Sequence, residues 1–288
     1  MLAATLLALA AAVLHAGWNL VAKRSADRFG ALWGQFLVAG VLSAVGLSVT
    51  GLPAARSLWF AALSGVVHIP YVVFLGRAYD RGEFSAAYPM ARGGGALVGA
   101  VGGVLFLGDR LHVLPWVALG IIATGIIGLG LSAGGRIRLT SAAGDASVVA
   151  LTIGIYSTSD AHGSRIAQSD ASYVLVEFVL LAIAVSIYAL AMGKKPSLRR
   201  ALVGTNGAIA PRSSVMMALS GVATVVTYAL VVAAFRRAPV GYVTGLRESS
   251  VIIAALIGVR FLGEGDARRR YAAAGLITGG IVLLVVAR

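Results

Sequence analysis

The chain has no cysteine and few charged residues. Asp, Glu, Lys and Arg make up 12% of its 288 residues, against about a quarter in an average soluble domain. Without cysteine it can form no disulfide framework and no thiolate metal site. Its four histidines are scattered without ligand spacing, so we expect no metal site. Hydrophobic residues make up 59% of the chain and the mean hydropathy is +0.90, so we expect an integral membrane protein.

Other sequence features exclude several functional classes. The net charge is +13, but the basic residues form short clusters between apolar runs, which predicts membrane topology rather than a nucleic-acid partner. The run Gly93–Gly95 lacks the Lys-Ser/Thr of a phosphate-binding loop, which argues against a nucleotide site and ATP-driven transport. No nucleophile–base cluster lies near an expected membrane interface. We therefore expect neither an enzyme nor a bound cofactor.

Apolar segments of roughly 20 residues are long enough to cross about 30 Å of hydrocarbon as helices. The chain contains ten such candidates, and the first lacks the charged leader of a signal peptide, so we expect it to be retained. The sequence thus predicts an all-α, multi-pass protein of the cell membrane. The segments are 2–22, 31–50, 58–79, 84–106, 113–132, 146–163, 172–192, 215–235, 239–261 and 270–287.

One stretch, 84–110, occurs twice at a shift of about 155 positions. Arg92 then falls on Arg247, and Phe-Leu-Gly-Asp at 106–109 falls on Phe-Leu-Gly-Glu at 261–264. This predicts a tandem duplication with five helices in each half, over residues 1–135 and 146–288. Because five is odd, the second half would be inverted relative to the first. Many secondary transporters share this architecture, with the substrate site near the middle of the bilayer.

The side on which the termini lie is predicted from the basic residues. Most Lys and Arg residues occur in the odd-numbered connections between the expected helices. By the positive-inside rule, these connections would be cytoplasmic and both termini would lie outside.

Polar residues in the first and third segments are candidate cavity residues. His15, Trp18 and Asn19 share one helical face through their i, i+3, i+4 spacing. His68 and Tyr71 flank Pro70 in the third segment. These side chains could instead be hydrogen-bonded packing residues, which are common between membrane helices.

The two repeated arginines are the strongest functional candidates. Arg92 and Arg247 lie about 12 Å into their segments, where an ionised group is costly and needs a partner. One interpretation places at least one of them in a translocation cavity, holding a carboxylate. The other pairs each with Glu177, Asp160 or Glu248, and the sequence leaves this choice open.

The remaining candidates are aromatic or acidic. Each acid is either a proton-coupling group or a permanent counter-ion; these are Asp160, Glu177 and Glu248. The aromatic residues would enclose the substrate. The predicted substrate-binding residues are His15, Trp18, Asn19, His68, Tyr71, Tyr88, Arg92, Tyr156, Tyr228 and Arg247.

Several of these motifs together resemble the EamA-type members of the drug/metabolite transporter superfamily. They are His-Ala-Gly-Trp-Asn at 15–19, Tyr-Pro-Met-Ala-Arg at 88–92, Arg-Glu-Ser-Ser at 247–250 and the two Leu-Gly-acid ends. The resemblance implies two inverted five-helix repeats around a cavity built from helices 1–4 and 6–9. It also implies cytoplasmic termini, in conflict with the charge distribution.

The expected function is secondary active transport of a small polar or amphoteric, amino-acid-like metabolite by alternating access, in the direction of export. The partners would be that substrate, the lipid bilayer and, as a candidate coupling ion, the proton. One alternative is efflux of lipophilic cationic drugs or toxic compounds by proton exchange. A channel or a membrane scaffold is a further alternative.

Overall fold

The computed structural model describes residues 1–81, 84–130, 141–202, 211–253, 256 and 267–287. Within these ranges the chain is helical and contains no strand, which confirms the all-helical prediction. The helices are α1 (Leu2–Arg24), α2 (Arg28–Thr50), α3 (Ala55–Arg81), α4 (Phe84–Leu107), α5 (Val113–Gly130), α6 (Ser141–Ile166), α7 (Asp170–Ala191), α8 (Lys195–Leu202), α9 (Pro211–Phe235), α10 (Val240–Arg247) and α12 (Ala267–Val286).

The helices have the lengths and compositions of a membrane protein. Five of them, α1, α2, α3, α7 and α9, are long and apolar enough to cross a bilayer, and α4, α5 and α12 contain shorter apolar helices. Large apolar side chains such as Val41, Val45 and Ile187 are exposed on the outside. α6, which carries Asp145 and Asp160, belongs to neither group.

Two regions differ from the expected segments. The connection after α7 contains the short helix α8, whose Arg200 bonds the Asp27 carboxylate at the start of α2. The segment expected to be one helix over 239–261 is interrupted. α10 ends at Arg247, a turn follows at Glu248, and helix resumes at Ser249.

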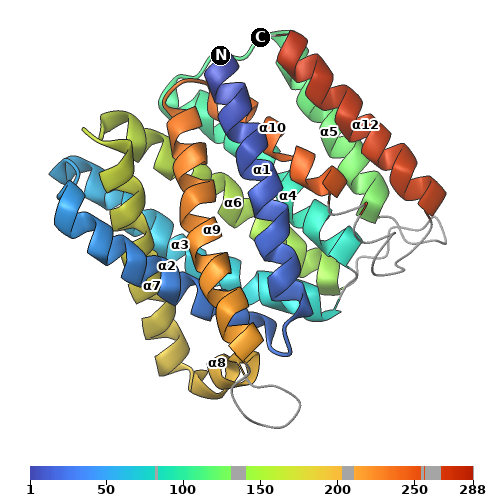
Figure 1. Cartoon of the computed structure of the whole chain (residues 1–288). Helices are drawn as coiled ribbons and strands as arrows, with labels where there is room; N and C mark the ends of the chain where they lie inside the picture. The colour runs from blue at the N-terminus through green and yellow to red at the C-terminus, as the bar shows by residue number, and fades with distance from the viewer. Residues whose placement is uncertain (82–83, 131–140, 203–210, 254–255, 257–266, 288) are drawn as a thin grey trace.

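Helices that are distant in the sequence pack side by side. α3 and α4 both lie along α6, while α9 packs against α1 and α2. α2 also packs against α7, and α5 pairs with α12 at one side of the bundle (Figure 1). Figure 1 shows the start of α1 and the end of α12 at the same end of the bundle, which we call the terminal end.

The first Leu-Gly-acid motif ends α4. Gly108 has a φ of +69°, a left-handed conformation that glycine adopts without steric cost. This turn lets the Asp109 N–H donate to the Gly103 carbonyl at 3.0 Å, which gives a partner to one of the free carbonyl groups at the end of the helix. The Asp109 carboxylate lies beside Gly103 of its own helix and contacts the ends of other helices.

Two glycines allow the close contact between α5 and α12. A Cβ atom added to Gly125 would lie 2.9 Å from the Ala273 carbonyl oxygen, and one added to Gly280 would lie 3.0 Å from the Ala118 carbonyl oxygen. Small residues at such positions let membrane helices approach closely. By contrast, Gly120 on α5 has no neighbour within 4 Å of the Cβ position.

We therefore predict opposite effects for two alanine substitutions on α5. Gly125→Ala forces α5 and α12 apart and should cost about 1–3 kcal/mol of stability. Gly120→Ala meets open space and should leave stability unchanged or raise it by up to about 1 kcal/mol through helix propensity. Melting curves of the detergent-solubilised variants measure this difference. Equal melting temperatures would contradict the assigned contact.

Candidate functional site

A small cavity lies in the middle of the bundle, with lining residues from α1, α2, α3, α6, α7, α9 and α10. Its volume is about 30 Å³, enough for about two water molecules. Eight of the predicted site residues line it: His15, Trp18, His68, Tyr71, Tyr156, Glu177, Tyr228 and Arg247. The structure therefore brings together residues from both halves of the chain.

Four other predicted residues are buried behind this lining: Asn19, Arg92, Asp160 and Glu248. Tyr88 lies on the first turns of α4, where its side chain is outside the described part of the structure. Sequence reasoning missed four lining residues: Phe36, Phe178, Thr224 and Thr227. The threonines had a usable signal, because Thr224, Thr227 and Tyr228 have the spacing of one helical face.

Aromatic rings form much of the cavity wall. The His68 ring stacks on Tyr156 at a centroid distance of 4.4 Å, and Tyr71 meets His68 edge-on at 5.3 Å. Tyr228 meets Tyr156 edge-on at 6.3 Å. The His68 ring is held by its Nδ1 atom, 2.8 Å from the Ser64 carbonyl oxygen. These contacts join α3, α6 and α9 around the cavity.

Two carboxyl groups lie close together on the acidic side of the site. Asp160 accepts hydrogen bonds from Ser64 Oγ and Tyr173 Oη, both at 2.9 Å, and from the Tyr228 hydroxyl. Glu177 Oε1 lies 3.4 Å from the same Ser64 Oγ. Since one hydroxyl has one proton, Ser64 can serve only one of the two acids at a time. In the described ranges, neither acid forms an ion pair.

Arg92 has its partners on the opposite side of the site. Its Nη2 atom lies 3.3 Å from Glu248 Oε1, and both side chains are almost completely buried. Its Nη1 atom lies 3.1 Å from Nε2 of His15, which accepts this hydrogen bond. Of the two alternatives left open by the sequence, pairing with an acid therefore describes Arg92.

Arg247 is placed differently, although the repeat aligns it with Arg92. It is the last residue of α10, immediately before the helix interruption, and its side chain lines the cavity while only 1% exposed. Adjacent helical residues point about 100° apart, so Glu248 can face Arg92 while Arg247 faces the cavity. No hydrogen bond or ion pair of the Arg247 side chain occurs within the described residues, and its Nε atom is buried without a partner.

Other cavity-lining side chains also have polar atoms without partners. Trp18 Nε1, Glu177 Oε2 and Thr227 Oγ1 are buried and make no hydrogen bond in the described part of the chain. Such atoms are rare, because an unpaired buried polar group costs about 1–3 kcal/mol. Donors and an acceptor from α1, α7, α9 and α10 thus converge on one cavity. This is the arrangement expected of a site that binds a polar ligand.

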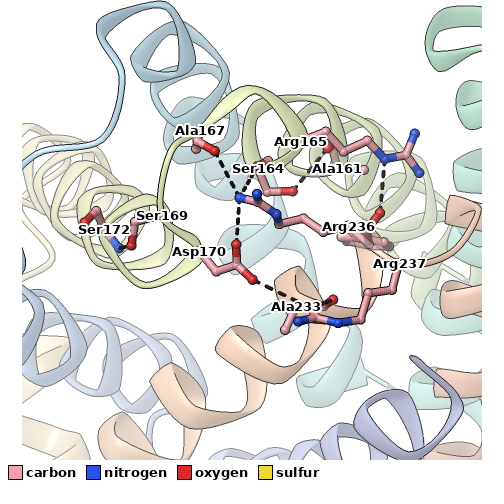
Figure 2. A network of polar contacts seen from close by, with 11 residues as sticks. Ala161, Ser164, Arg165, Ala167, Ser169, Asp170, Ser172, Ala233, Arg236 and Arg237 are labelled. Atoms are coloured by element: carbon pink, nitrogen blue, oxygen red, sulfur yellow. Dashed lines mark hydrogen bonds and ion pairs between the residues drawn. The ribbon is translucent and has the colours of Figure 1, made fainter. Parts of the chain in front are cut away.

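Polar contacts close both ends of the bundle. At the terminal end, Arg165 on α6 binds the Asp109 carboxylate at 2.7 and 3.3 Å, and Asp109 accepts from the Val240 N–H at 2.7 Å. Figure 2 shows Arg236 beside Arg165. Arg236 pairs with Asp170 at 2.7 Å and donates to the carbonyl oxygens of Ser164 and Ala167 at the end of α6.

Several contacts tie the opposite end. Arg28 pairs with Asp80 at 3.2 Å, and Arg81 pairs with Asp145 at 2.9 Å. Lys23 Nζ donates to the Tyr79 carbonyl oxygen at 2.7 Å. The central cavity is therefore enclosed between two polar closures.

Within the described ranges, no cluster of three or more His, Asp or Glu residues could hold a metal ion.

The comparisons with known proteins bear on the fold. No family model matches the chain, and no curated protein matches it. A solved structure described only as "Crystal structure of protein" superposes with a TM-score of 0.71 at 18% identity, covering 98% of this chain and 96% of the other. At this identity the likeness shows a shared fold and nothing about activity.

We predict that Glu248→Gln destabilises the protein far more than Asp80→Asn. The first change leaves the Arg92 guanidinium buried without its carboxylate, and breaking such a pair costs about 3–5 kcal/mol. The second removes the partner of a half-exposed pair, which is worth at most about 1 kcal/mol. Melting temperatures in detergent compare the two. Similar losses would show that Glu248 does not neutralise Arg92.

Proposed function

We propose that this protein is a secondary active transporter of the cell membrane that moves a small amphoteric metabolite by alternating access. The observation that carries the proposal is the central cavity, where unpartnered polar atoms of both charge types meet aromatic rings between the two halves of the chain. Four such atoms of described residues gather at this one small cavity, which packing of a scaffold in an apolar medium does not require.

The packing of the helices supports an inverted repeat of ten crossings, in which α6, α7, α9, α10 and α12 repeat α1 to α5. α3 packs on α6 and α7, and its counterpart α9 packs on α1 and α2. α4 likewise packs on α6, and α10 packs on α1. The pairs α2 with α7 and α5 with α12 map onto themselves. A two-fold axis relating the two halves would produce this exchange of partners.

Individual contacts support the same relation. Lys23 at the end of α1 donates to the Tyr79 carbonyl oxygen, and Arg165 at the end of α6 donates to the Phe235 carbonyl oxygen. One contact lies at each end of the bundle. In each, the end of the first helix of a half binds the end of the third helix of the same half, in corresponding positions.

The ion pairs at the ends follow the same pattern. Arg28 at the start of α2 pairs with Asp80 at the end of α3, while Asp170 at the start of α7 pairs with Arg236 at the end of α9. The charges are exchanged but the positions correspond. Because the two ends are built from equivalent contacts, opening one end while the other stays closed is an economical route to alternating access.

The mixture of side chains in the cavity favours an amphoteric substrate. The Arg247 guanidinium would bind a carboxylate, for which its planar donors are well suited. The Glu177 carboxylate would accept from an ammonium group, and the aromatic rings would enclose the rest of the molecule. A cavity of about 30 Å³ is too small for such a molecule, so binding requires one end to open.

Glu177 is also our candidate for proton coupling. Asp160 accepts three hydroxyl hydrogen bonds, which suit an ionised carboxylate, whereas Glu177 has one long contact and a bare oxygen. A proton would therefore reside on Glu177 when the site is empty. The substrate's ammonium group would replace it, which couples substrate export to proton entry.

One observation favours a second candidate function. In the described ranges both acids near the cavity lack a basic partner, and aromatic rings surround the cavity, so a lipophilic cation could also bind there. This alternative gives the central role to the acids and a structural role to both arginines. It predicts that binding survives the loss of Arg247.

The first test measures ligand binding to detergent-purified protein by thermal shift against amino acids, organic acids and lipophilic cations. A ligand that binds the folded state raises the melting temperature. We expect carboxylate-bearing hits, and Arg247→Gln should weaken their binding by about 30-fold or more, since removing a buried charged partner costs about 2–5 kcal/mol. Arg199→Gln, on exposed α8, is the control. Hits confined to lipophilic cations and unaffected by Arg247→Gln would support the second function instead.

The second test concerns the proton. In proteoliposomes, Glu177→Gln should remove the response of substrate flux to an imposed pH gradient, because glutamine cannot exchange a proton. Substrate counterflow needs no net proton movement and should persist in the variant at higher substrate concentration, because the glutamine amide oxygen still accepts a hydrogen bond from the ammonium group. A variant that still concentrates substrate in response to the gradient would rule out Glu177 as the coupling group. Flux without saturation or counterflow would indicate a channel.

A further inference from the structure

A second and larger hollow lies outside the central site, between α3 and α4. Both helices pack along α6 but make few contacts with each other, so α6 forms the floor of a groove between them. The groove has a volume of about 540 Å³, within the range of ligand-binding pockets. Its walls include Phe60 and Leu63 on α3, Val101 and Phe106 on α4, and Ile155 on α6.

The groove is mostly apolar in composition, and the hydroxyl groups on its floor are bonded within the protein. The Thr158 hydroxyl on its floor donates to the Gly154 carbonyl at 2.9 Å, and the Ser159 hydroxyl donates to the Phe60 carbonyl at 3.0 Å. Both hydroxyl protons are therefore already used. A third polar lining residue, His162, packs its ring against Phe60 at a centroid distance of 4.4 Å. Leu63, Val101 and Phe106 are exposed at the open side of the groove, which faces outward from the bundle. A hydrocarbon chain matches this surface.

The length of the groove matches one leaflet of a bilayer. Along α4 its lining runs from Val98 to Leu107, the last residue of the helix. Nine residue steps at 1.5 Å correspond to about 13.5 Å, close to half of the roughly 30 Å hydrocarbon thickness. The groove therefore extends from the membrane interface at the terminal end to about the middle of the bilayer.

Cationic and aromatic side chains lie near the interfacial mouth of the groove. Arg56 precedes Phe60 by one helical turn, and Arg110 follows Leu107 by three residues; both are exposed. Neither forms a hydrogen bond or ion pair within the part of the chain that the structure describes. Trp59 is 80% exposed beside Phe60, as expected of an aromatic residue in the headgroup region. These features complement an anionic headgroup.

We propose that the groove between α3 and α4 binds one anionic phospholipid, with an acyl chain along α6 and the phosphate near Arg56 and Arg110. The lipid is bound in the leaflet at the terminal end. Behind the groove floor, Ser159 is followed by Asp160 of the central site, so the bound chain packs against the helix that carries this acid. The proposal requires a membrane location but not transport.

Native mass spectrometry of the delipidated protein, titrated with phosphatidylglycerol and phosphatidylcholine, tests the site. Ile155→Trp fills the groove and should weaken the first phosphatidylglycerol bound by roughly tenfold or more. Ile187→Trp makes the same change on the exposed face of α7, away from the groove, and should leave binding unchanged. Leu63→Trp, on the α3 wall, serves as a second groove-filling variant if Ile155→Trp fails to fold.

The arginines give an independent prediction. Arg56→Gln and Arg110→Gln should each lower the preference for phosphatidylglycerol over phosphatidylcholine by roughly fivefold. Equal lipid binding by wild type and both folded groove-filling variants would overturn the proposal. Groove-filling variants that lose transport of lipophilic compounds but still bind phosphatidylglycerol would also overturn it, since the groove would then be a lateral substrate entrance.

Discussion

A polar group carried into an apolar medium needs a partner, and most of this structure follows from how that need is met. Arg92 is neutralised by Glu248, and Asp160 is saturated by three hydroxyl groups. Arg247 and Glu177 differ, because within the described residues neither forms an ion pair and each has a buried atom without a partner at the same cavity. The difference separates side chains that hold the helices together from side chains available to a ligand.

The same need for partners determines the contacts at the ends of the bundle. Charged residues are placed where helices end, and they bind carboxylates and free carbonyl groups of neighbouring helices. Asp109 contributes most at the terminal end, since its carboxylate binds Arg165 and caps α10 while its own N–H caps α4. Such contacts are exchangeable with water, unlike packed apolar surfaces. They suit the opening and closing that the proposed transport cycle requires.

The sequence predicted the helices well because apolar length and glycine-acid boundaries are local signals. It could not predict the interruption at Glu248, where the chain departs from the helix that its apolar pattern favours. It also could not decide between Arg92 and Arg247, because their difference depends on whether Glu248 reaches one or the other in three dimensions. Phe36 and Phe178 line the cavity without any distinguishing pattern, since lining and packing phenylalanines look alike in a sequence.

The most direct test of the account is whether the cavity opens to opposite sides when opposite ends are loosened. The chain has no cysteine, so Thr227→Cys places a single thiol at the cavity. Its labelling by an impermeant maleimide would be measured from each side of oriented vesicles. Asp109→Asn should raise labelling only from the side of the terminal end, and Asp145→Asn only from the opposite side. Equal labelling from both sides, or the same side in both variants, would contradict alternating access.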